Sequence, residues 1–165
     1  MPHKPRIILG IDPGFGRMGY GLIESGQGTV RYLLANCLET QKTMPHAQRL
    51  QYMWRELITL ITTYQPDVVA VEKLFFAKNE KTALAVAETR GIILLAAQEH
   101  GVPIIEFTPL QVKVALSGYG KADKKQVAYM VMRILNLTDT PVRDDTTDAL
   151  AIAICAAHTN TFTSR

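Results

Sequence analysis

Four acidic side chains stand at positions where their charge needs a partner. Asp12 directly follows the apolar run RIILGI, and Glu72 closes the apolar run VVAV. Asp145 and Asp148 lie three positions apart just before the run ALAIAI, a spacing that places both on one face of a helix. A carboxylate at the edge of a buried segment is costly unless it is paired or bound to a metal. These four acids are therefore candidate site residues.

Gathered at one site, four carboxylates would repel one another. Two like charges 4 Å apart cost ~4 kcal/mol at an effective dielectric constant of about 20, so a bare cluster would take up protons or bind cations. Oxygen ligands without His or Cys favour Mg²⁺ or Mn²⁺. Two such ions about 3.5 to 4 Å apart can activate a water molecule and stabilise the leaving oxygen of a phosphodiester. The predicted chemistry is metal-dependent phosphodiester hydrolysis.

Each acid also has an ordinary structural explanation. Asp12 begins the sequence Asp-Pro-Gly, whose residue types suit a plain turn. Acidic side chains near the start of a helix interact favourably with its macrodipole, and Asp144 or Asp145 could simply cap the last helix. Asp148 is harder to explain in this way, because it immediately precedes an apolar run at the edge of the core.

The segment GIDPGFGRMGYG contains a G-x-G-x-x-G pattern at Gly14, Gly16 and Gly19. Such a pattern binds a dinucleotide only where it opens a helix whose N-terminus faces the pyrophosphate. Further glycines follow closely, each costing a helix interior about 1 kcal/mol relative to Ala, and the next residues, YGLIES, favour a strand. The glycines are better explained by a tight hairpin that lets another backbone approach closely.

The elements that must position the acids follow from hydrophobic periodicity and turn residues. Strands are expected at 6–11, 20–25, 30–39, 67–72 and 102–107. Helices are expected at 45–64, 79–101, 109–116 and 123–135, with a last helix from the Asp144 region through ALAIAICAAH.

This order predicts an α/β fold in one domain over residues 1–165, with a five-stranded mixed sheet of three antiparallel strands and then two parallel ones. Helices should cover both faces. The two apolar strands reached through helical crossovers should run parallel to each other and to the first strand. If the first and fourth strands are neighbours, Asp12 and Glu72 meet at the carboxyl edge, where open α/β sheets place their ligands.

Composition excludes some classes of protein. The chain has 165 residues, is 47% hydrophobic and contains no apolar run near the length of a membrane span. The N-terminal apolar stretch has no small-residue cleavage site, so we expect a cytoplasmic protein without a membrane partner. Cys37 and Cys155 lack metal-site or disulfide spacing and are expected to be free, buried thiols.

The net charge is +3. Setting the four candidate acids aside leaves a more basic remainder, which would suit a polyanionic partner. Alternatively, the slightly basic pI of 8.9 does not indicate any particular partner, and the net charge alone favours this second interpretation.

Four segments in this order resemble the RuvC family of bacterial Holliday junction resolvases, which are ribonuclease H-like. They are ILGIDPG, VVAVEKLFFAKN, RGIILLAAQEHGVPIIEFTPLQVK and DDTTDALAIAI, and the likeness runs from about residue 6 to 158. By similarity, Asp12, Glu72, Asp145 and Asp148 take the places of the family's four acidic catalytic residues. Some members have His at the position of Asp145.

The resemblance implies an endonuclease of homologous recombination and DNA repair. A homodimer would grip a four-way DNA junction and nick two strands symmetrically with two Mg²⁺ ions per subunit, or Mn²⁺ in their place. It would leave 5′-phosphate and 3′-hydroxyl ends and work with a branch-migration motor of the RuvA and RuvB type.

The helix expected over 80–99 bears on the dimer, because apolar residues lie on more than one side. Ala83, Leu84 and Gly91 share one side, while Ile93 and Ala97 lie on another. Such a helix must be covered twice, either by other helices of the chain or by a twin subunit.

Basic and aromatic residues provide candidate DNA contacts. Phe75 follows Glu72 closely, among Lys78 and Lys81, a mixture suited to stacking a base and holding phosphates, although adjacent Phe residues are more often core. The resemblance assigns Phe75 to base stacking at the junction centre. It also matches Lys113 and Lys124 to lysines that contact DNA near the cut. Lys121 and Lys125 lie in the glycine-flexible segment SGYGKADKKQ, which could equally be a solvated turn.

Three other classes of protein share some of these features. The related RuvX-type nucleases are shorter and are not expected to carry FFAKN or the paired helix acids in this form. An actin-like or sugar-kinase-like nucleotide-binding module needs two such domains and a much longer chain. A catalytically silent relative is disfavoured by the complete set of four acids.

Overall fold

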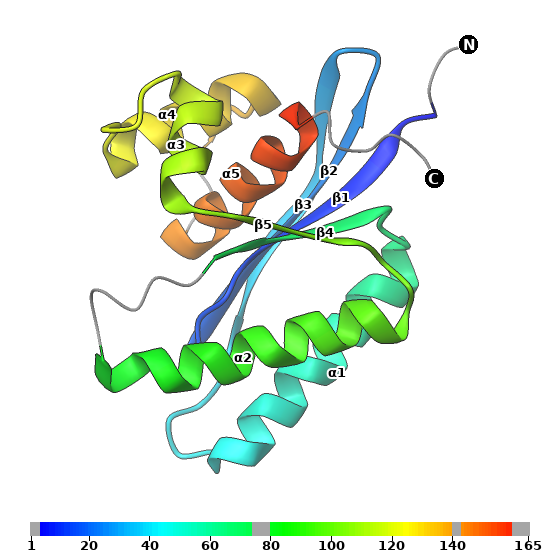
Figure 1. Ribbon diagram of the computed structural model, residues 1–165, viewed down its shortest axis with the longest axis vertical. Helices are drawn as coiled ribbons and strands as arrows, with labels where there is room; N and C mark the ends of the chain where they lie inside the picture. Colours follow the sequence, from blue (N-terminus) through cyan, green and yellow to red (C-terminus); the bar gives the residue numbers. More distant parts are fainter. Residues whose placement is uncertain (1–3, 74–79, 140–142, 160–165) are drawn as a thin grey trace.

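Five strands form one mixed sheet in the order β3-β2-β1-β4-β5 (Figure 1). The computed structural model describes residues 4–73, 80–139 and 143–159. β1 (Arg6–Asp12) pairs antiparallel with β2 (Arg17–Gly26), which pairs antiparallel with β3 (Thr29–Glu39). On its other side β1 pairs parallel with β4 (Val68–Glu72), which pairs parallel with β5 (Ile104–Phe107). The predicted mixed sheet is confirmed.

Helices cover both faces of the sheet (Figure 1). α1 (His46–Tyr64) and α2 (Glu80–Glu99) pack on one face; α3 (Pro109–Ser117), α4 (Lys124–Leu135) and α5 (Asp144–His158) pack on the other. The alternation of a strand divides β1 between the two layers. Ile8 joins the α3–α5 layer and Leu9 joins the α1–α2 layer, and both are fully buried.

α5 is the most deeply buried helix and packs directly on β1 and β2. Its Ala-rich sequence lets it approach the sheet closely, and a Cβ atom at Gly10 or Gly19 would overlap the backbone oxygen of Ala149 or Asp145. Gly10, Gly19 and Gly21 of this segment therefore make room for a helix, whereas a Cβ atom at Gly14 would meet the Arg17 carbonyl oxygen. The expectation of a close backbone approach is confirmed, and the approaching element is α5.

Most predicted elements agree with the structure to within a few residues. β2 begins at Arg17, earlier than the expected residue 20, because Arg17, Met18 and Gly19 continue the ladder with β3. α4 begins where Asp123 and Gln126 form a capping box, each side chain accepting a hydrogen bond from the other's backbone N–H.

Two further observations complete the fold. No helix within the described ranges is both long and apolar enough to span a bilayer. In the described part of the chain, Cys37 and Cys155 are free; Cys155 is buried as expected, but Cys37 is only half-buried. The single domain over residues 1–165 stays a prediction.

Candidate active site

Asp12 and Glu72 lie at the same edge of the sheet. β1 and β4 are parallel neighbours in which Ile11 pairs with Val71, and each acid is the next residue of its strand. The first and fourth strands are thus neighbours, which was the condition for the two acids to meet. It places two carboxylates at the carboxyl edge, where open α/β sheets bind ligands.

The pKa of Asp12 shows that its charge is poorly compensated. Burial, and then the charges of Glu72, Asp148 and Asp145, raise the pKa of Asp12 to about 7. Burial, and then Asp148, raise the pKa of Glu72. No hydrogen bond or ion pair from the described residues reaches either side chain. The charge of Lys124 opposes both shifts, but within the described residues neither carboxylate has the bonded partner that a buried charge ordinarily requires.

α5 brings the other two acids to the same region. Asp145 and Asp148 lie one helical turn apart at its N-terminal end, and both contribute to the raised pKa of Asp12. Burial also raises the pKa of Asp148, although the nearby Lys124 opposes this shift. The close packing of α5 at Gly19 sets the depth at which Asp145 stands.

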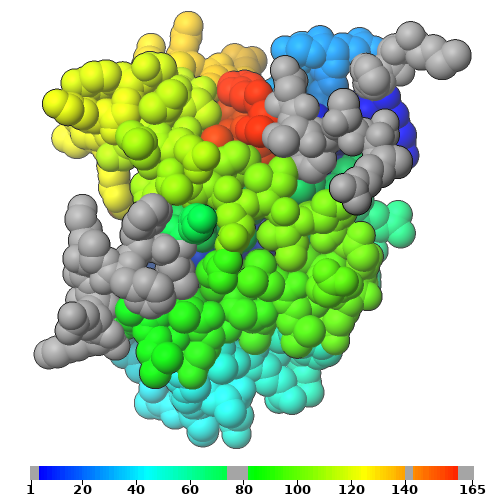
Figure 2. Space-filling model, in the orientation of Figure 1, coloured from blue at the N-terminus to red at the C-terminus, as the bar shows by residue number. Residues whose placement is uncertain are grey.

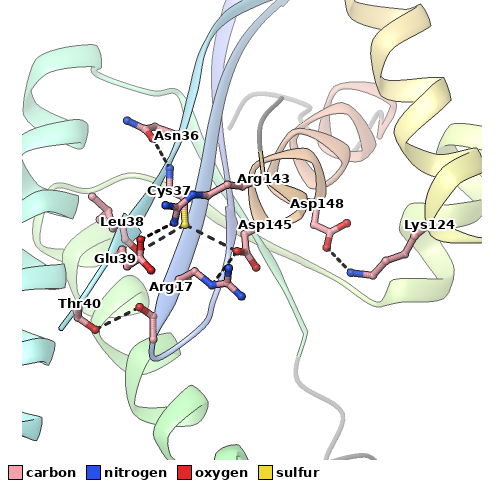
Figure 3. Close-up of polar contacts among 11 residues, drawn as sticks. Arg17, Asn36, Cys37, Leu38, Glu39, Thr40, Lys124, Arg143, Asp145 and Asp148 are labelled. Atoms are coloured by element: carbon pink, nitrogen blue, oxygen red, sulfur yellow. Dashed lines mark hydrogen bonds and ion pairs between the residues drawn. The ribbon is translucent and has the colours of Figure 1, made fainter. Parts of the chain in front are cut away.

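Unlike the strand acids, the helix acids have basic partners (Figure 3). Asp145 Oδ2 lies 3.5 Å from Arg17 Nε, and 4.0 Å from the Cys37 thiol that donates to it. Asp148 Oδ2 accepts a hydrogen bond of 3.3 Å from Lys124 Nζ. These ion pairs orient the helix acids toward their own cations.

The four acids share one region, but they do not form a ready-made metal site. No three His, Cys, Asp or Glu side chains within the described ranges are arranged so that they could hold a metal ion. The donor set nevertheless suits a divalent cation, because carboxylate oxygens are hard ligands and Asp12 and Glu72 lack an ion-pair partner in that part of the chain. At such a site Arg17 and Lys124 would compete with a cation for the Oδ2 atoms of Asp145 and Asp148.

The turn that follows Asp12 is fixed by contacts that sequence reasoning missed. Arg49 donates from Nη2 to the Phe15 carbonyl oxygen at 3.1 Å and from Nε to Thr40 Oγ1 at 2.8 Å. Its guanidinium also lies 3.8 Å from the centroid of the Phe15 ring. That ring stacks on His46, whose Nε2 is 2.5 Å from Glu88 Oε2 of α2. The turn is thereby tied to both α1 and α2.

The predicted DNA-contacting lysines divide by position. Lys113 is half-buried on α3, whereas Lys121, Lys124 and Lys125 are exposed at the start of α4 and just before it. Phe75 and Lys78 lie outside the described residues. Lys81 belongs to α2, but its side chain is also outside the description. Among the lysines of this set whose side chains are described, Lys124 alone contacts a candidate acid.

Comparison with known proteins gives a consistent result. A family model described as crossover junction endodeoxyribonuclease RuvC matches residues 8–156. A protein of that name from Alkaliphilus oremlandii is 50% identical over 157 residues, covering 95% of this chain and 96% of the relative. Another, from Desulforamulus reducens, is 49% identical over 160 residues, covering 96% and 98%.

Solved structures agree with these relatives. RuvC of Thermus thermophilus in complex with a Holliday junction substrate matches with a TM-score of 0.87 and 36% identity, covering 92% of this chain and 93% of that one. The yeast mitochondrial Holliday junction resolvase matches with a TM-score of 0.66 and 17% identity, covering 91% and 77%. At that identity the second match shows a shared fold alone.

Proposed function

The chain belongs to the RuvC family of crossover junction endodeoxyribonucleases, and on this premise we propose that Asp12, Glu72, Asp145 and Asp148 form its catalytic centre. Its fold is ribonuclease H-like, and it is an endonuclease that resolves Holliday junctions. One observation carries the assignment of the site. Three separate elements bring four carboxylates to one sheet edge, where burial and mutual repulsion raise the pKa of Asp12 to about 7.

The four carboxylates would hold two Mg²⁺ ions, or Mn²⁺ in their place. When bound, such ions supply activation of water and charge stabilisation at the leaving oxygen. Asp12 and Glu72 offer oxygens from the rigid ends of β1 and β4. Asp145 and Asp148 offer theirs from α5 after releasing Arg17 and Lys124.

The basic side chains then have a second task at the substrate. Lys124, once released from Asp148, lies at the site with its ammonium free to bind the phosphate to be cleaved. Lys113, Lys121 and Lys125 are proposed to hold flanking phosphates, and Phe75, Lys78 and Lys81 the junction centre. Hydrolysis in line leaves a 5′-phosphate and a 3′-hydroxyl.

Two symmetric nicks require two sites, and α2 provides the surface for a homodimer. Ile93 and Ala97 are buried in the layer between α2 and the chain's own sheet, which is one of the two surfaces expected to cover this helix. Leu84 and Leu95 remain 71% and 52% exposed on another side. No described residue of the chain covers that side, so a twin subunit across a two-fold axis is the proposed second cover.

Two predictions about partners and place stay untested. The cytoplasmic location is one, and cooperation with a branch-migration motor of the RuvA and RuvB type is the other. Both depend on the activity proposed here, since such a motor and this enzyme would share the junction as substrate.

A synthetic four-way junction and a linear duplex of the same sequence test the proposal directly. Each is mixed with the protein in Mg²⁺, Mn²⁺ or EDTA, and the products are resolved on a denaturing gel with end-labelled strands. We expect paired nicks in the junction alone, only with metal, and ligatable ends. Cleavage of the duplex at the same rate, or of the junction in EDTA, would contradict the proposal.

A further inference from the structure

A shallow groove of about 410 Å³ lies between the end of α3 and the first turns of α4. Tyr119, Tyr129, Ala122, Met130 and Lys125 are among the residues that line it. We call it the Tyr119–Tyr129 groove. Its volume is in the range of sites that bind small molecules or single building blocks of a polymer. The α3–α4 segment (yellow-green to yellow) lies at the periphery of the molecule (Figure 2).

The two tyrosines are exposed to an extent that folding does not explain. Tyr119 is 57% and Tyr129 is 60% exposed, whereas Ala122, which lines the same groove, is 1% exposed. Aromatic rings held at the surface over an apolar floor provide stacking platforms for nucleic acid bases, whose faces are all suitable partners. The groove thus has the walls that a base needs.

The free polar groups of the groove are mostly hydrogen-bond donors. The capping box uses Asp123 Oδ1 and Gln126 Oε1 to accept backbone N–H groups at 2.8 and 2.9 Å. The Gln126 amide N–H groups therefore remain, together with the Lys125 ammonium and two phenol hydroxyls. No hydrogen bond or ion pair from the described residues engages these groups. A ligand that satisfies them is anionic and rich in acceptors, as a nucleotide is.

The groove also adjoins the candidate active site. Lys124, which pairs with Asp148, immediately precedes Lys125 in the first turn of α4. The two lysines lie about 100° apart around the helix. Lys124 therefore faces Asp148, while Lys125 lines the groove. A DNA strand whose phosphate is held at Lys124 can continue past Lys125 into the groove.

We propose that the Tyr119–Tyr129 groove binds one nucleotide of the junction strand that is cut, close to the cleaved phosphate, stacking its base on a tyrosine and holding its phosphate at Lys125. This inference rests on the proposed function and adds a subsite to it. The groove would favour strands whose base at that position leaves its neighbours easily, because the base must leave the stack to enter.

Photo-crosslinking in the wild-type protein tests the contact itself. 5-Iodo-2′-deoxyuridine is placed singly at each of the first few nucleotides on either side of the cut in a synthetic junction. The complex is formed in EDTA so that the strand stays intact, irradiated, and mapped by mass spectrometry. We expect crosslinks to Tyr119 or Tyr129 from one position beside the cut. A complex that forms without crosslinks to either tyrosine from any position would overturn the proposal.

Substitutions measure what the groove contributes. Tyr119→Ala with Tyr129→Ala should weaken junction binding about 10-fold or more, while the Tyr→Phe pair should lose much less, because it keeps the stacking faces and gives up only the two phenol hydroxyls. Lys125→Ala should lower the slope of log affinity against log salt by about one. Tyr52→Ala is the control, because Tyr52 is a partly exposed tyrosine on α1; its binding should not change.

The outcomes separate the subsite from the enzyme. Alanine variants that remain folded and bind the junction as tightly as the wild type would remove the groove and leave the proposed function standing. A wild-type protein that neither binds nor cuts the junction would overturn both. The crosslinking result decides the matter if the alanine variants fail to fold.

Discussion

The four acids of the site form two pairs that differ in what surrounds them. Asp12 and Glu72 end strands in the middle of the sheet and have no ion-pair partner among the described residues, and their pKa values are raised first of all by burial. Asp145 and Asp148 stand on a helix at the border of the site, and each faces a basic side chain. The strand pair is rigid and has no bonded cation among the described residues. The helix pair has bonded cations, and its side chains can turn.

This difference assigns separate tasks to sheet and helix. The two strand acids cannot move apart, because neighbouring strands fix both backbones. Their repulsion therefore favours the uptake of a proton or a cation. The helix pair adds to that repulsion, and Arg17 and Lys124 offset part of its charge. Metal binding is thus expected to exchange two side-chain cations for two metal ions.

The largest effect is expected from breaking the strand pair. Asp12→Asn removes a proposed ligand whose rigid position no other residue can replace. We expect cleavage to fall by about 10³-fold or more, while the affinity for a junction in EDTA stays within a few-fold. Single-turnover cleavage and a gel-shift titration measure the two quantities. Cleavage at the wild-type rate would remove Asp12 from the mechanism.

The same variant sharpens the comparison through pH. With a pKa of about 7 in the folded protein and about 3.9 unfolded, Asp12 keeps a proton on folding between these values. The free energy of unfolding therefore falls as pH rises through this window, by up to about 4 kcal/mol from this group. In EDTA, Asp12→Asn should melt like the wild type near pH 4 and clearly higher at pH 8. An equal difference in melting temperature at both pH values would contradict the raised pKa.

The rigidity of the strand side depends on the turn after Asp12. Arg49→Ala removes the donor to the Phe15 carbonyl and the cation over its ring, so the turn should loosen. We expect about a 10²-fold slower cleavage step with little change in junction affinity. Arg55→Ala, an exposed arginine of the same helix, is the control and should cleave normally. Equal rates for the two variants would show that the turn needs no such support.

The helix side depends on how closely α5 packs. Gly19→Ala places a methyl group on the backbone oxygen of Asp145, so α5 must move away from the sheet. We expect a loss of about 1 to 3 kcal/mol in the free energy of unfolding, measured in urea, and slower cleavage. Gly91→Ala is the control for the unfolding of the single chain alone, since no atom of the same chain lies within 4 Å of a Cβ atom there, and in the monomer it should be neutral or stabilising. A neutral Gly19→Ala would contradict the packing described here.

Sequence reasoning predicted the backbone of the site better than its side chains. The apolar run before Asp12 and the run before Glu72 predict buried parallel strands, and the strand order then brings the two acids to one edge. The apolar run after Asp148 likewise predicts a buried helix. These inferences succeed because burial patterns along a chain determine which elements form and how they layer.

The direction of a side chain at the sheet edge left no such signal. Arg17 lies in a segment that was expected to be a turn, and its partner Asp145 is distant in the sequence. Arg49 likewise bonds Phe15, 34 positions away. Such contacts depend on how loops and helices meet after folding, and no local pattern of residue types records them.

Removing Arg17 tests whether this side chain competes with a metal ion for Asp145. Arg17 is 56% exposed at its side chain, so Arg17→Ala should change the free energy of unfolding by less than about 1 kcal/mol. Because Arg17 competes with a metal for Asp145, its loss should tighten Mn²⁺ binding by a factor of about five, corresponding to ~1 kcal/mol for a solvated ion pair. Calorimetric titration measures this without any cleavage assay. Arg31→Ala is the control, because it breaks a similarly exposed pair with Glu24 between β3 and β2. Weaker Mn²⁺ binding in Arg17→Ala alone would mean that Arg17 supports Asp145 as a ligand. Both acid pairs would then be held in position for a metal ion before it binds.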